Sequence, residues 1–110
     1  MTRRPQGLLP GTVDVLILRT LALEPMHGYG IARYVRERSD GALTIESAAL
    51  YQALHRLERK RWVRSSWGVS ETNRRAKFYE LTAAGRKHLQ VERAQLGAYI
   101  DALKVLLEPG

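Results

Sequence analysis

The sequence predicts a mainly α-helical domain that carries one small β-hairpin. Two patterns support this class: four segments repeat apolar residues at helical spacing, whereas residues 62–81 are rich in aromatic and β-branched residues that alternate. The length of 110 residues is typical of one domain, and a hydrophobic fraction of 45% is enough for one compact core. We therefore expect a single folded unit rather than a disordered chain.

The first two helices are expected in the N-terminal half of the chain. The segment GTVDVLILRTLALEP predicts the first, with Thr12 as its N-cap and Pro25 just beyond its end. Apolar residues cover so much of this helix that we expect it to be covered on several sides, in part by a partner chain. A second helix is expected over residues 28–39, after His27 as a cap or turn residue, and the segment ALTI that follows could be briefly extended.

The third helix is expected to begin with Ser47 as its N-cap and to end near Lys60. Leu50, Leu54 and Leu57 fall on one face at helical spacing and predict the side that packs into the core. The opposite face carries Ala48, Gln52, His55, Arg56 and Arg59. A helix that enters the major groove of DNA needs such a face, with a small residue for close approach and amide or guanidinium groups that read bases.

A hairpin and a long last helix complete the prediction. The segments WVRSSWGV and RRAKFYEL predict two strands, joined by the turn-like SETN. Thr82 is the expected cap of the last helix, and Gly85 weakens its first turn. This helix has a long apolar face formed by Leu89, Leu96, Tyr99, Ile100, Leu103, Leu106 and Leu107. The order predicts a winged helix–turn–helix over residues 1–81 and a C-terminal dimerisation helix over residues 82–110, in one compact unit.

The positive charge of the chain is concentrated in one short segment. The whole sequence has 18 Lys and Arg against 11 Asp and Glu, a net charge of +7, and residues 56–77 alone hold eight against two, which gives +6. Such an excess favours an anionic partner, with nucleic acid first and an acidic membrane surface second. Arg74, Arg75 and Lys77 lie beside the hairpin turn, where they would contact the phosphate backbone.

Other classes of function have little support in the sequence. The absence of cysteine excludes disulfides and cysteine-ligated zinc and fits a cytoplasmic protein. The three histidines are scattered, and the GYG segment lacks the Lys-Ser/Thr of a phosphate-binding loop. We therefore expect no enzyme, no cofactor and no metal site. The N-terminus has no apolar signal core, and we expect no membrane span.

Three segments together resemble the PadR family of transcriptional regulators, in its short form with a single C-terminal helix. They are LILRTLALEPMHGYGIARYV, ALYQALHRLERKRWVRSSW and NRRAKFYELTAAGRKHL. The resemblance implies a winged-helix homodimer that binds a roughly palindromic operator on double-stranded DNA as a repressor. The dimer would form through the last helix and part of the first, including Leu16, and a small phenolic or lipophilic molecule would release it from DNA.

The resemblance also assigns positions to the DNA interface. Ser47, Tyr51, Gln52, His55 and Arg56 fall in its recognition helix, and Arg74, Arg75 and Lys77 fall in its wing. Arg59 and Lys60 are expected to contact phosphates as well. Two residues depart from the family pattern, because Gln52 stands where relatives often have Pro and Arg61 where they often have Gly. We expect these two positions to make the operator preference of this protein differ from that of its relatives.

The effector and the class of partner are the points that the sequence leaves open. The expected effector pocket lies at the dimer seam around Leu8, Val13, Leu96 and Tyr99. A constitutive regulator without an effector is one alternative. A winged-helix module that binds an acidic protein is the other, and weak salt dependence of DNA binding would favour it.

Overall fold

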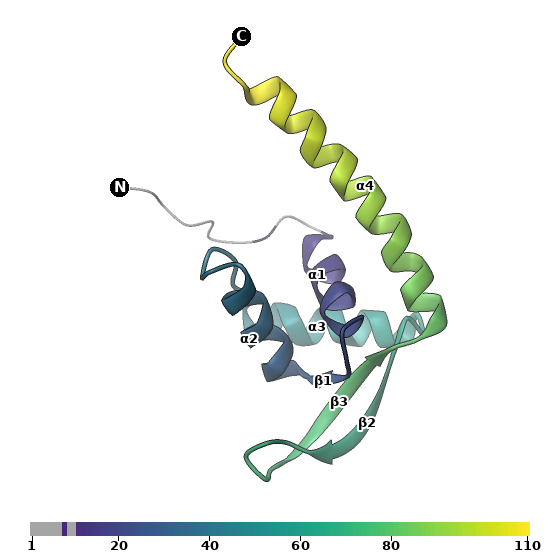
Figure 1. Ribbon diagram of the computed structural model, residues 1–110. Helices are drawn as coiled ribbons and strands as arrows, with labels where there is room; N and C mark the ends of the chain where they lie inside the picture. The colour runs from purple at the N-terminus through teal and green to yellow at the C-terminus, as the bar shows by residue number, and fades with distance from the viewer. Residues whose placement is uncertain (1–7, 9–10) are drawn as a thin grey trace.

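The computed structural model describes residue 8 and residues 11–110. Figure 1 shows three short helices grouped beside a small sheet and a long helix that runs away from them. The elements are α1 (Thr12–Leu21), β1 (Met26–His27), α2 (Gly28–Arg38), α3 (Ser47–Arg59), β2 (Val63–Val69), β3 (Arg75–Leu81) and α4 (Ala83–Leu107). This arrangement confirms the predicted winged-helix class.

The core forms where α1 meets α2, α3, β3 and the start of α4. Ile17 and Leu18 of α1 are fully buried, as are Ile31 of α2 and Leu57 of α3. Burial of an aliphatic side chain of this size contributes about 1.5–3 kcal/mol to stability. The wide apolar surface of α1 is therefore covered largely within the single chain.

Two of the four predicted helix caps are correct. The Nδ1 atom of His27 accepts a hydrogen bond from the amide of Gly30 at 3.0 Å, and Oγ1 of Thr82 accepts one from Gly85 at 3.0 Å. The predictions for the other two helices are wrong by one residue. Gly11 rather than Thr12 is the N-cap of α1, and Glu46 rather than Ser47 is the N-cap of α3.

Both misplaced caps have the same physical reason. Thr12 and Ser47 already belong to the first helical turn, whereas a capping residue has a non-helical backbone. Gly11 has a φ of 87°, a left-handed conformation that glycine adopts without a steric penalty. Neither Gly11 nor Glu46 caps its helix through a side-chain hydrogen bond.

The sheet has three antiparallel strands in the order β1-β3-β2, one more than the predicted hairpin. In the added pair Met26 lies opposite Tyr79 and His27 lies opposite Phe78. A strand of two residues is too short to show alternation in the sequence. The ALTI segment forms no strand, although Ile45 within it is buried in the core.

Helix α3 ends in a left-handed turn at Arg61, whose φ is 63°. The amide of Arg61 donates to the carbonyl of Glu58, and the amide of Trp62 donates to the carbonyl of Leu57, both at 3.0 Å. This pair of bonds is the Schellman motif, in which glycine usually occupies the left-handed position. The Arg at this position therefore keeps the regular helix end and adds an exposed cation beyond it.

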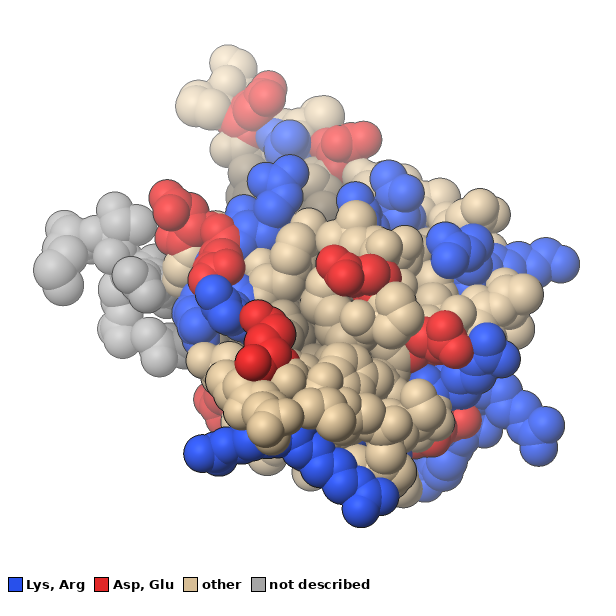
Figure 2. Space-filling model, turned by 60° about the horizontal axis from the view of Figure 1, so that its bottom comes forward, with Lys and Arg blue, Asp and Glu red and all other residues tan. Residues whose placement is uncertain are grey.

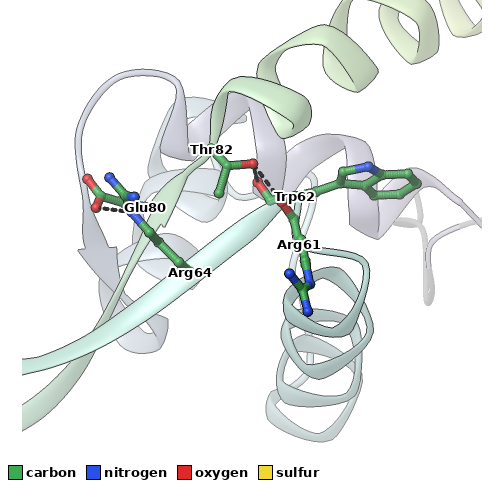
Figure 3. A network of polar contacts seen from close by, with 5 residues as sticks. All are labelled: Arg61, Trp62, Arg64, Glu80 and Thr82. Carbon is green, nitrogen blue, oxygen red and sulfur yellow. Dashed lines mark hydrogen bonds and ion pairs between the residues drawn. The ribbon is translucent and has the colours of Figure 1, made fainter.

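A compact polar junction joins the end of α3 to the start of α4 (Figure 3). The hydroxyl of Thr82 donates to the carbonyl of Arg61 at 2.7 Å and lies 3.0 Å from the carbonyl of Trp62. The backbone amide of Thr82 also donates to the carbonyl of Trp62, at 3.0 Å. Thr82 thus caps α4 and at the same time satisfies two carbonyl groups that follow α3.

Candidate nucleic-acid interface

Helix α3 separates a buried face from an exposed one, as its sequence predicts. Leu50, Leu54 and Leu57 are buried, together with Ala53. The predicted interface residues on this helix are all exposed: Ser47, Ala48, Tyr51, Gln52, His55, Arg56 and Arg59, with Lys60 just after its end. By helical geometry the centre of the exposed face lies about 140–200° from Leu50.

The exposed side chains of α3 do not all point the same way. Ala48, Gln52, His55 and Arg59 share the centre of the face, whereas Tyr51 and Arg56 lie on opposite flanks at about 100° and 240° from Leu50. Lys60 turns toward the junction, with its ammonium 4.9 Å from the centre of the Trp62 ring.

Tyr51 lies on the flank of α3 that faces the start of α2. A Cβ atom placed on Gly28 would lie 2.5 Å from the Tyr51 hydroxyl oxygen. The glycine at this position therefore lets the two helices approach closely. This contact explains the first glycine of the GYG segment as a packing requirement rather than a phosphate-binding feature.

Arg56 lies on the other flank and contacts α1. Its Nη2 atom donates a hydrogen bond to Oδ1 of Asp14 at 2.8 Å, and the two residues form an ion pair between α3 and α1. The two partners are 42 positions apart, so no local sequence pattern predicts this pair.

The β2–β3 hairpin forms the wing, and its predicted cations differ in their contacts. Arg74 is exposed at the turn, next to Asn73, whose φ is 62°. The guanidinium of Arg75 lies 4.7 Å from the centre of the Trp67 ring, an aromatic side chain that is 61% exposed. Trp67 therefore lies at the surface of the wing and makes a cation–π contact with Arg75, since a guanidinium over an indole ring is a favourable pairing.

Lys77 connects the wing to α3 rather than standing alone. Its Nζ atom lies 3.8 Å from Oε1 of Glu58, and the hydroxyl of Ser65 donates to Oε2 of the same carboxylate at 2.5 Å. Burial and the Glu58 carboxylate raise the pKa of the Tyr79 phenol. Glu58 therefore fixes the orientation of the wing relative to α3.

A groove of about 1090 Å³ lies between α2 and the wing. Its lining includes Tyr51 of α3, Tyr29 and Arg33 of α2, and Trp67 and Arg75 of the wing. Tyr29 is 65% exposed although it is a large aromatic residue. The hydrogen bond and the charge of Glu37, whose carboxylate lies 3.1 Å from Nε of Arg33, raise the pKa of that guanidinium.

Tyr29 and Arg33 are not among the interface residues predicted from the sequence. Ile31 and Val35 are both buried, and they mark the face of α2 that packs into the core. The residues on the opposite face of α2 are the ones available to a partner. Tyr29 and Arg33 lie about 160–200° from Ile31 on the same helix, so helical spacing predicts that both point outward.

Positive side chains frame the end of the molecule that carries the wing. Figure 2 turns the lower end of Figure 1 toward the viewer and shows Lys and Arg along the lower edge and clustered on the right-hand side, with tan, uncharged surface in the lower middle and separate Asp and Glu groups at the centre, left and right. An uncharged strip bordered by cations suits a polyanion whose bases are contacted at the centre and whose phosphates are contacted at the edges.

Neither a metal-binding cluster nor a membrane-spanning helix is found in the part of the chain that the structure describes. Across residue 8 and residues 11–110, no group of three or more His, Asp or Glu side chains gathers to hold a metal ion. Over the same residues, no helix combines the length and the hydropathy needed to cross a lipid bilayer.

Comparison with known proteins agrees with this geometry. Residues 17–91 match the transcriptional regulator PadR-like family. A protein of Lysinibacillus sphaericus named "Uncharacterized protein X" is 28% identical over 104 residues, which cover 92% of this chain and 95% of that protein.

Two solved structures show the same fold. A transcriptional regulator from Clostridium thermocellum is 28% identical, with a TM-score of 0.80 over 89% of this chain and 92% of that one. A PadR family transcription regulator from Clostridium difficile is 29% identical, with a TM-score of 0.76 over 89% of this chain and 100% of that one. The family consists of regulators that are not enzymes. Since the family match covers most of the residues that build the winged helix, this chain belongs to the PadR-like family of transcriptional regulators.

Proposed function

We propose that this chain binds double-stranded DNA as a homodimer at a pseudo-palindromic operator in the cytoplasm and represses transcription there. The observation that carries the proposal is the exposed face of α3, which presents Gln52, His55 and Arg59, with Tyr51 on its flank lining the groove between the start of α2 and the wing. A helix with such a face fits the major groove, and the wing reaches the adjacent phosphates.

The residues of the proposed interface divide into three roles. Gln52 and Arg56 read bases, since an amide pairs with adenine and a guanidinium with guanine, each with about 1–3 kcal/mol of discrimination. Ser47, Ala48, Tyr51 and His55 line the approach to the groove. The phosphate contacts come from Arg59, Lys60, Arg74, Arg75 and Lys77, which supply salt-dependent affinity.

The two-fold axis of the proposed dimer sets the spacing of the operator. Two α3 helices about 34 Å apart would enter successive major grooves on one side of the duplex. The apolar face of α4 supports this arrangement, because Tyr99, Ile100, Leu106 and Leu107 are exposed in the single chain. Leu16, Leu96 and Leu103 are half-buried and complete the proposed seam.

Leu89 is removed from the proposed dimer interface. Its side chain is only 4% exposed and packs in the core of its own chain. A partner chain would have almost no surface of this residue to contact.

Replacing Arg56 and Arg75 separately by alanine tests the proposed interface. The Arg56→Ala variant is expected to lose preference for the base pair that it contacts, because a bidentate contact to guanine is removed. The Arg75→Ala variant is expected to bind all sequences more weakly, with the slope of log affinity against log salt reduced by about one. Both are measured by binding-site selection and by titration of operator and random duplexes at several salt concentrations.

The control for these variants is Arg93→Ala, which removes the same charge from an exposed position on α4. We expect it to leave operator binding nearly unchanged. Wild-type behaviour of Arg56→Ala and Arg75→Ala would contradict the proposed interface, and DNA binding that hardly depends on salt would favour an acidic protein as the partner.

The proposed effector is a small lipophilic or phenolic molecule bound at the dimer seam. Leu8, Val13 and Leu96 are only partly buried in the single chain, and Tyr99 is exposed, so a partner that closes the seam would enclose them. The ligand must prefer the conformation that does not bind DNA, because equal affinity for both conformations shifts nothing.

Titration of the protein–operator complex with 4-hydroxycinnamic acid and with a lipophilic cationic dye tests the effector. At least one of them is expected to weaken operator binding, and Tyr99→Ala is expected to reduce that response while Val105→Ala retains it, since both residues are exposed on α4. Operator affinity that stays constant at every concentration of both compounds would make the protein a constitutive regulator.

A further inference from the structure

The ion pair between Asp14 and Arg56 lies at the edge of the surface proposed to read DNA. Oδ1 of Asp14 accepts the hydrogen bond from Nη2 of Arg56 at 2.8 Å. The side chains are 28% and 46% exposed, so the carboxylate is the more sheltered partner and the guanidinium still reaches solvent. Neither residue therefore needs to move far for DNA and Asp14 to contact Arg56 together.

The chemistry of the guanidinium allows two partners at once. Arginine has five N–H donors in a fixed plane, and the bond to Asp14 uses one of them. The remaining donors include those of the other amino group, and two donors are sufficient for a bidentate contact to guanine. The Asp14 carboxylate can therefore fix the orientation of the guanidinium while the free N–H groups of the guanidinium contact a base.

The position of Asp14 in α1 makes it a rigid anchor. It lies in the first turn of the helix, where the helix dipole stabilises a negative charge. Helix α1 is also the element at the centre of the core, with Ile17 and Leu18 fully buried. An arginine held from such an anchor loses less side-chain freedom when it binds than one that is free in solvent.

We propose that Asp14 is a positioning residue that orients Arg56 for its base contact and thereby sets sequence preference. This inference rests on the proposed DNA-binding function. It assigns a role to a negatively charged residue outside the recognition helix and the wing.

The test measures discrimination rather than affinity alone. The operator is compared with a duplex in which the guanines that depend on Arg56 carry 7-deazaguanine, which lacks the N7 acceptor. The wild type is expected to distinguish the two duplexes, whereas Arg56→Ala does not. In Asp14→Asn the ratio of the two dissociation constants is expected to fall about threefold to fivefold, as for loss of a partly exposed ion pair.

Glu80→Gln provides the matched control, because Glu80 forms an ion pair with Arg64 at 2.6 Å across the hairpin (Figure 3). Both variants lose one negative charge, so both are expected to bind random DNA slightly more tightly. Only Asp14→Asn is expected to lose discrimination. In the double variant Asp14→Asn/Arg56→Ala, the Asp14 substitution is expected to have no further effect on the ratio.

Three outcomes would contradict the inference. An unchanged ratio in Asp14→Asn would mean that Asp14 contributes only its charge. Operator binding that tightens more than in Glu80→Gln would mean that Asp14 competes with DNA for Arg56. An Arg56→Ala variant that still distinguishes the duplexes would remove the contact that Asp14 is proposed to orient. Failure of the wild type to prefer any operator over random DNA would instead overturn the proposed function itself, and with it this role of Asp14.

Discussion

Replacing Gly85 by alanine is expected to lower the free energy of unfolding by about 3 kcal/mol. A Cβ atom at this position would overlap the carbonyl oxygen of Trp62 and lie 2.8 Å from Cδ1 of Leu81. The carbonyl cannot move aside, because it accepts the hydrogen bond from the amide of Thr82. The usual gain from replacing a helical glycine by alanine, about 1 kcal/mol, is therefore reversed.

Gly97→Ala is the matched control on the same helix, since a Cβ atom there has no neighbour within 4 Å. We expect this variant to be unchanged or stabilised by up to about 1 kcal/mol. Urea unfolding followed by circular dichroism measures both variants, at several protein concentrations because dimerisation makes stability depend on concentration. Equal effects of the two substitutions would contradict the close packing at the junction.

Replacing Leu103 by glutamate is expected to convert the proposed dimer to a monomer and to weaken operator binding by about 100-fold or more. Leu103 lies at the centre of the apolar face of α4, within about 60° of Tyr99, Ile100 and Leu106. A buried carboxylate in each half of the seam would be uncompensated. A monomer would keep one recognition helix and lose the second half-site.

Val105→Glu is the control for this variant, because Val105 is 72% exposed and lies about 160° around the helix from Leu103. It is expected to remain dimeric and to bind the operator normally. Sedimentation at micromolar concentration gives the oligomeric state, and circular dichroism verifies that both variants are folded. A wild type that sediments as a monomer would overturn the proposed dimer.

The periodic elements of the fold are those that the sequence predicts well. The leucines of α3 recur every three to four residues and all face the core, and the two long strands end within a residue or two of the predicted segments. Such patterns are local, so each can be found within a window of about a dozen residues. The exposed face of α3 follows from the same pattern without any knowledge of the tertiary structure.

Contacts between distant segments are what the sequence does not reveal. Strand β1 exists only because Met26 and His27 meet β3 some fifty residues later, and the pairing of Arg56 with Asp14 spans 42 positions. The predicted caps at Thr12 and Ser47 are wrong by one residue for a different reason, because the residue type locates a helix start only to within about one position. Among the predicted interface cations, Arg56 and Lys77 form ion pairs with carboxylates. The number of charged residues in a segment does not reveal such pairs.

The junction at Thr82 gives the long last helix the properties of a lever arm. Helix α4 has 25 residues and is therefore about 37 Å long, and its first turn is fixed to the end of α3 by the hydrogen bonds of one hydroxyl. Because this junction is stiff, α4 and the winged helix move together. A tilt of α4 by about 5° about its far end displaces the winged helix by roughly 3 Å. That distance is close to one base-pair step of about 3.4 Å. In the proposed dimer, a small change in the angle at the seam would therefore be enough to put the two recognition helices out of register with the operator.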